Sequence, residues 1–280
     1  MTDQQFGLLV ETATLAEHLN TENVRIVFVG DAQTYARAHI PGSVLIEYAD
    51  LVTQRPPAGG ILPDMADLGR VLGAAGITPQ THVIALDNGR HTSAARLFWT
   101  LDCLGHGGCS LLNGGLNAWM AEQRPTTQGP APVPSDTPDY PARLANPQAQ
   151  ADVDYIVDHL DDPAVRIVDA RSAAEYTGDD VRAARGGHIP GACHIEWSAN
   201  IDPNNAGRLQ PDAVLEQMYQ DAGLEREQVV ITHCQTHHRS SLTYFVLRYL
   251  GYTHARGYDG SWSEWGNHPA LPISTEHQSF

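Results

Sequence analysis

The chain has 280 residues, and all 17 of its Lys-plus-Arg positions are arginine. The absence of lysine excludes Schiff-base and pyridoxal-phosphate chemistry, and it excludes a phosphate loop of the Walker type. The 33 acidic residues bring the net charge to −16, which disfavours binding to nucleic acid and to anionic membranes.

The sequence carries no signal for a membrane or an oxidising compartment. No apolar stretch approaches the roughly 20 residues that a membrane-spanning helix needs. The N-terminus lacks a basic segment followed by a cleavage site, so we predict no signal peptide. The cysteines, at positions 103, 109, 193 and 234, are too irregularly spaced for a disulfide framework. We therefore predict a cytoplasmic protein.

The chain contains two copies of one sequence pattern. His-Ile-Pro-Gly occurs at 39–42 and again at 188–191. A second pair of similar segments consists of Asn-Gly-Gly-Leu-Asn-Ala-Trp at 113–119 and Asp-Gly-Ser-Trp-Ser-Glu-Trp at 259–265. Matches in the same order along the chain predict a tandem repeat. We predict one domain over 1–123, a second over 148–280, and an extended linker over 124–147, which holds seven of the 18 prolines.

Strand-like and helix-like segments alternate within each copy. In the second copy, the β-branched runs at 165–168 and 229–232 are typical of buried parallel strands. Apolar residues at helical spacing predict helices over 211–222 and 240–250. The fold class is therefore α/β, with two tandem domains that each contain a parallel β-sheet flanked by helices. Ligands bind beyond the carboxyl ends of the strands in such sheets.

Cys234 lies at that position in the second copy. It directly follows a predicted strand, and Arg239 opens the next helix after the four residues Gln235, Thr236, His237 and His238. Loop amides and a helix N-terminus together form an anion-binding concavity, and such a concavity stabilises a thiolate. We predict that Cys234 is the catalytic nucleophile and that residues 235–239 form the active-site loop.

The first copy has Asp87 at the position of Cys234. A carboxylate cannot act as a sulfur nucleophile and would repel an anion, so we predict that the first domain is catalytically silent. Because His39 and His188 occur in both the silent and the active copy, we assign them structural roles.

Taken together, these motifs resemble a two-domain rhodanese. The resemblance rests on the repeated His-Ile-Pro-Gly motif, on Asp-Ala-Arg at 169–171, and on a C-x4-R loop in the second copy alone. The loop Cys-Gln-Thr-His-His-Arg-Ser resembles a bacterial subgroup of the family. The resemblance implies a thiosulfate sulfurtransferase in which a persulfide forms on Cys234 and passes its sulfur to cyanide or a thiol. It implies no cofactor, although a protein could serve as sulfur donor or acceptor.

The sequence leaves two alternative functions open and argues against a metal site. Cysteine-dependent phosphatases and arsenate reductases use a C-x5-R loop, one residue longer than the loop here. A non-catalytic sulfur carrier would take its sulfur from a partner protein. A zinc site would need four ligands in a tetrahedral arrangement, whereas the adjacent His237 and His238 point apart, and we predict no metal.

Residues outside the loop give weaker signals. Arg185 could bind the donor anion through its bidentate fork, and Trp197 could line the substrate pocket. Mercaptopyruvate enzymes of this family tend to carry an arginine where this chain has Glu175. A carboxylate there disfavours a carboxylate substrate, so the sequence favours thiosulfate or a protein-borne sulfur donor.

Overall fold

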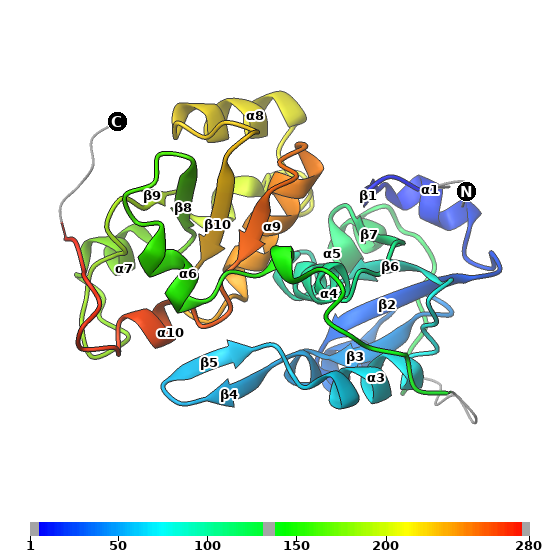
Figure 1. Ribbon diagram of the computed structural model, residues 1–280. Coiled ribbons are helices and arrows are strands. Elements are labelled where there is room, and N and C mark those ends of the chain that lie inside the picture. Colours follow the sequence, from blue (N-terminus) through cyan, green and yellow to red (C-terminus); the bar gives the residue numbers. More distant parts are fainter. Residues whose placement is uncertain (1–5, 131–137, 276–280) are drawn as a thin grey trace. The chain divides into compact units, whose positions relative to one another are not determined.

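The computed structural model describes residues 6–130 and 138–275 (Figure 1). The chain divides into two compact units. The first comprises the chain up to Leu51, Pro63–Asn146 and Asp202–Leu209, and the second comprises Val52–Leu62, Pro147–Ile201 and the chain from Gln210 onward. Each unit thus includes a short segment from the other sequence repeat.

The first unit is built on a five-stranded parallel sheet in the order β1-β7-β6-β2-β3. Its strands are β1 (Leu9–Val10), β2 (Val24–Gly30), β3 (Val44–Glu47), β6 (His82–Leu86) and β7 (Cys109–Leu112). Its helices are α1 (Thr12–Glu17), α2 (Ala32–Arg37), η1 (Tyr48–Leu51), α3 (Met65–Ala74), α4 (Thr92–Cys103) and α5 (Gly115–Ala121). Apolar residues of the central strands, such as Ile26, Phe28 and Ile84, form the core with Trp119.

The second unit repeats this plan with one strand fewer. Its parallel sheet has the order β11-β10-β8-β9 and consists of β8 (Val165–Asp169), β9 (Cys193–His194), β10 (Val229–His233) and β11 (Ala255–Gly257). Its helices are η2 (Pro147–Ala149), α6 (Val153–Asp158), α7 (Ala173–Thr177), η3 (Trp197–Asn200), α8 (Asp212–Asp221), α9 (Arg239–Tyr249) and α10 (Ser261–Trp265). The predicted fold class is confirmed, and the predicted strands and helices fall where the sequence pattern placed them.

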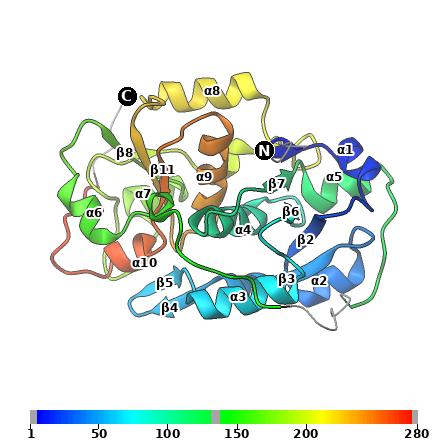
Figure 2. The same ribbon diagram turned by 45° about the vertical axis from the view of Figure 1, so that its right-hand side comes forward.

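A separate antiparallel hairpin belongs to the second unit. It is formed by β4 (Thr53–Arg55) and β5 (Ala58–Ile61), and β5 packs against α10, as the turned view shows (Figure 2). Residues 52–62 lie within the first sequence repeat. The second unit, whose main part begins at Pro147, therefore includes a segment from the first repeat.

The two units share local structure as well as topology. In the first, the rings of Tyr35 and His39 stack with centroids 3.9 Å apart, and His39 Nδ1 lies 3.0 Å from the Tyr35 carbonyl oxygen. In the second, Tyr176 and His188 stack at 3.7 Å with the corresponding contact at 2.9 Å. These contacts give the histidines of the repeated motif a structural role in both units.

The linker ends also pack on the first unit. The Tyr140 amide donates to the Gly69 carbonyl, and the Asn146 amide donates to the Cys103 carbonyl at the end of α4. The middle of the predicted linker, residues 131–137, lies outside the described residues. None of the helices in the described part of the chain is long and apolar enough to cross a membrane.

Candidate active site

The sheet of the second unit places Cys234 at the carboxyl end of a central strand. Cys234 is the first residue after β10, which pairs on one side with β8 and on the other with β11. Cys234 is 1 % exposed. The loop that follows ends at Arg239, where α9 begins. The structure therefore brings the predicted loop residues together at one edge of the sheet.

Ser261, which sequence reasoning missed as a site residue, supports this loop. Its hydroxyl oxygen accepts from the Cys234 amide at 3.4 Å and from the His237 amide at 3.0 Å, while the hydroxyl donates to the Tyr258 carbonyl. The amide of Trp262 donates to the Cys234 carbonyl. Ser261 belongs to the repeated motif at 259–265, and that repetition was the signal in the sequence that could have pointed to it.

Several loop amides remain available for an anion. Among residues 6–130 and 138–275, no group accepts a hydrogen bond from the amides of Gln235, Thr236, Arg239 or Ser240. These amides lie beside Cys234 at the start of α9, where the helix dipole also favours negative charge.

The two loop histidines have different environments. His237 is fully buried, its Nδ1 lies 2.8 Å from the Ser240 hydroxyl, and its φ of 52° is a left-handed conformation. His238 is partly exposed and occupies the N-cap position of α9 without a capping hydrogen bond from its side chain. Of the two, His238 therefore has the better access to solvent.

Arg239, whose side chain is partly exposed, forms an ion pair with the buried Glu175. Its two terminal nitrogens donate to the two carboxylate oxygens at 2.6 Å and 2.8 Å. Burial alone would lower the pKa of Arg239, but the hydrogen bonds to Glu175 and the neighbouring Cys234 sulfur raise it above its ordinary value. Glu175 is only 1 % exposed and also closes a capping box with Ser172 at the start of α7.

The stability of this pair should depend on pH. Burial opposes ionisation of Glu175, but Arg239 and Ser172 lower its pKa from 4.5 to about 2. Since the folded state lowers this pKa, the stabilisation is complete above pH 4.5 and is lost as the pH falls towards 2. We expect the difference in unfolding free energy between the wild type and Glu175→Gln, measured by denaturant titration, to shrink over that window. A difference that does not change between pH 6 and pH 2.5 would contradict the assignment, and Glu216→Gln, in an exposed pair with Arg226, serves as the control.

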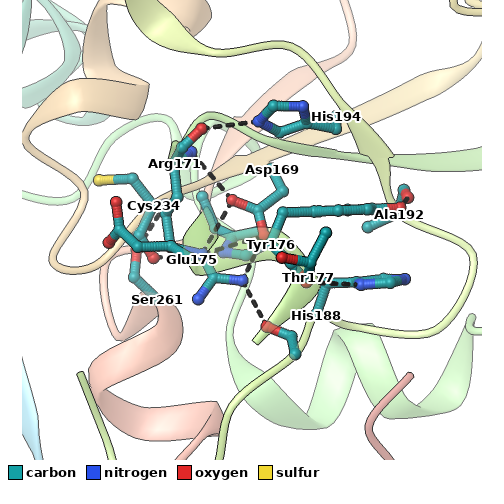
Figure 3. A network of polar contacts seen from close by, with 12 residues as sticks. Asp169, Arg171, Glu175, Tyr176, Thr177, His188, Ala192, His194, Cys234 and Ser261 are labelled. Carbon is teal, nitrogen blue, oxygen red and sulfur yellow. Dashed lines mark hydrogen bonds and ion pairs between the residues drawn. The ribbon is translucent and has the colours of Figure 1, made fainter. Parts of the chain in front are cut away.

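A second buried network lies behind the loop (Figure 3). Arg171 forms an ion pair with Asp169 at 2.6 Å, donates to the Gly187 carbonyl and lies 4.2 Å above the Trp262 ring. His233 Nε2 is 3.5 Å from Asp169 Oδ2, and burial, together with the charge of Arg171, lowers the pKa of His233 to about 4. His233 is therefore neutral near pH 7, and Asp169 and Arg171 are the charged pair of this network.

The first unit shows what the same loop does with a carboxylate. Asp87 directly follows β6, as Cys234 follows β10. One of its oxygens accepts from the amides of Gly89, Arg90 and His91 at 2.8–3.0 Å, and the other accepts from the amides of Ser93 and Ala94 at 3.1 and 3.5 Å. The loop of the first unit is thus an anion site that Asp87 itself fills, so the carboxylate is bound there rather than merely repelling other anions.

The predicted residues outside the loop lie as follows. The Arg185 guanidinium donates to the carbonyls of Leu271, Trp265 and His268, so its contacts hold the segment after α10. Trp197 begins η3 and is partly exposed, and its amide donates to the Ala170 carbonyl just beyond the carboxyl end of β8. The described residues include no group of three or more His, Cys, Asp or Glu side chains that could hold a metal ion.

Comparison with known proteins identifies the family. The model of the rhodanese-like domain matches this chain twice, at residues 11–122 and 152–268. The chain belongs to the rhodanese-like family. The predicted tandem rhodanese architecture is thereby confirmed.

Relatives of this rhodanese-like protein span nearly its whole length. The thiosulfate sulfurtransferase of Pseudomonas aeruginosa is 39% identical over 267 residues, which cover 95% of this chain and 96% of the relative. The sulfur carrier protein TtuD of Thermus thermophilus is 32% identical, with the same coverage. The crystal structure of SseA from Escherichia coli, described with the catalytic mechanism of 3-mercaptopyruvate sulfotransferases, is 26% identical, with a TM-score of 0.80 over 92% of this chain and 99% of SseA. Sulfur transfer is the chemistry that these names share.

Proposed function

We propose that this protein transfers sulfane sulfur from thiosulfate, or a related anionic donor, to a thiophilic acceptor through a persulfide on Cys234. The Cys234 thiolate attacks the outer sulfur of the donor, the sulfur–sulfur bond of thiosulfate breaks, and sulfite leaves with the bonding electron pair. Cyanide or a thiolate then attacks the outer persulfide sulfur and releases the Cys234 thiolate. The cycle needs no cofactor and no external oxidant or reductant.

The observation that carries this proposal is the contrast between Asp87 and Cys234. In the first unit, five amides bind the carboxylate of Asp87. In the second, the corresponding loop presents its unused amides beside a sulfur atom. Backbone amides of this kind stabilise anions of small size, as a thiolate and a persulfide are.

The Arg239–Glu175 pair favours thiosulfate over mercaptopyruvate as the donor. Both terminal nitrogens of Arg239 are bound to Glu175, so the guanidinium fork is not open to a substrate carboxylate. A donor bound through loop amides does not need that fork. The names of the Pseudomonas relative and of several others agree with this choice.

Mass spectrometry of the intact protein after incubation with thiosulfate tests the proposal. We expect a gain of one sulfur atom, located on the peptide that contains Cys234 and removed by cyanide with formation of thiocyanate. A steady-state donor panel should rank thiosulfate above 3-mercaptopyruvate by kcat/KM. If no sulfur is gained from any small donor, or if it is gained on Cys103, Cys109 or Cys193, the proposal fails.

A sulfur carrier is the second candidate, favoured by the name of the Thermus relative. A carrier would form the same Cys234 persulfide, but a partner protein would supply the sulfur. Persulfide that forms with a cysteine desulfurase and cysteine, but not with thiosulfate, would favour the carrier over the sulfurtransferase.

A further inference from the structure

The hairpin β4–β5 is in direct contact with the active-site loop of the second unit. Gly60, at φ +79°, lies so close to Thr236 that a methyl group on it would come within 2.1 Å of the Thr236 carbonyl oxygen. The amide of Gly59 donates to the Ser263 hydroxyl, and the amide of Leu62 donates to Asp259 Oδ2, each at 2.9 Å. The hairpin is therefore anchored on both sides of Gly60.

This contact fixes one peptide group of the loop from both ends. The Thr236 carbonyl faces Gly60, and the amide of the same peptide group, which belongs to His237, donates to the Ser261 hydroxyl at 3.0 Å. His237 has the unfavourable φ of 52°. Because a peptide group is planar, holding both of its ends fixes its plane, and this limits the backbone rotations by which the preceding Thr236 and Gln235 amides can turn in the loop around Cys234.

The first unit has the same arrangement around its own loop. Gly207, at φ +78°, lies where a methyl group would come within 2.6 Å of the Gly89 carbonyl oxygen, and the amide of Leu209 donates to Asn113 Oδ1. Gly207 follows Gly60 by 147 residues, the same spacing that separates Cys234 from Asp87. Each loop is thus held by a glycine from the other sequence repeat, and only one of the two loops contains a cysteine.

We propose that Gly60 is a positioning residue for the sulfur-binding loop, so that the first repeat completes the active site of the second. This inference rests on the proposed function only for its kinetic readout. It also assigns a role to the silent repeat, which supplies the segment that orients the loop amides around Cys234.

Three glycine-to-alanine variants of the full-length protein test this inference. Gly60→Ala adds a methyl group against the Thr236 carbonyl, and we expect kcat/KM for thiosulfate to fall by about 100-fold because small displacements of reacting groups have effects of that order. Gly207→Ala makes the corresponding clash at the silent loop, and Gly42→Ala, at φ +78°, has nothing within 4 Å of the added methyl group. Both controls should lose stability from backbone strain while sulfur transfer stays within about two-fold of the wild type.

A second readout separates this inference from the proposed function. The alkylation rate of Cys234 by iodoacetamide reports on the loop without any sulfur donor, and it should change in Gly60→Ala but not in the two controls. If Gly60→Ala unfolds the hairpin, Ser263→Ala provides a milder change, since it adds no clash and removes one hydroxyl, which accepts from the Gly59 amide and contacts the Gly59 and Gly260 carbonyls. Wild-type rates of alkylation and sulfur transfer in both Gly60→Ala and Ser263→Ala would overturn the inference, whereas a wild type that takes no sulfur from thiosulfate would overturn the proposed function alone.

Discussion

Replacement of Cys234 by alanine is expected to abolish sulfur loading, and replacement by aspartate should abolish it while stabilising the fold relative to alanine. Alanine removes the nucleophile and leaves the loop amides without a partner. Aspartate places a carboxylate where Asp87 binds five amides in the first unit. A carboxylate at a helix N-terminus contributes about 1–2 kcal/mol over alanine.

The measurements are intact mass after thiosulfate treatment and denaturant unfolding of the wild type, Cys234→Ala, Cys234→Asp and Cys234→Asn. Asparagine is the matched control, because it has the shape of aspartate without its charge. Stability in the order Asp above Asn above Ala would support an anion-binding loop around Cys234. An aspartate variant no more stable than alanine would contradict it, and sulfur gained by the alanine variant would exclude Cys234 as the nucleophile.

Replacement of Arg239 by methionine is the second change with a large expected effect. It leaves the Glu175 carboxylate, which is 1 % exposed, with only the exposed Arg182 guanidinium at 3.8 Å as a cation, and removing one partner of a buried pair costs about 3–5 kcal/mol. The variant also loses the positive charge beside Cys234. We therefore expect both the unfolding free energy and the rate of sulfur loading to fall.

A double variant separates these two effects. Arg239→Met combined with Glu175→Gln removes both charges and keeps an amide for the capping box with Ser172, so most of the lost stability should return. Sulfur loading should stay low, since the charge near Cys234 is still missing. Arg226→Met, which breaks an exposed pair with Glu216, is the control and should cost at most about 1 kcal/mol. Full recovery of loading in the double variant would show that Arg239 acts through stability alone.

Much of the fold could be predicted from short-range patterns. The β-branched runs before Asp169 and Cys234 are strands, and the apolar spacing after Arg239 is a helix, because hydrophobic periodicity reflects local geometry. The place of Cys234 at the end of a parallel strand followed from that order alone. The internal repeat also allows Asp87 to be aligned with Cys234 from the amino-acid sequence alone.

Other features depend on contacts between distant parts of the chain. Nothing in the local pattern around Gly60 indicates that it faces Thr236, 176 residues later. The partner of Arg239 was equally hidden, because Glu175 lies on a different helix and was considered only in relation to the substrate. Ser261 was noticed as part of a motif, but its bonds to two loop amides follow from the tertiary structure.

The hydrogen bonds of Asp87 show that one loop backbone accommodates two different side chains at its first position. In the first unit, the loop amides at the start of the helix donate hydrogen bonds to the Asp87 carboxylate. In the second unit the corresponding position holds the buried sulfur of Cys234, with loop amides beside it. A cysteine and an aspartate at this position therefore suit the same backbone, because the carboxylate accepts hydrogen bonds from loop amides that a sulfur atom leaves open to an added anion.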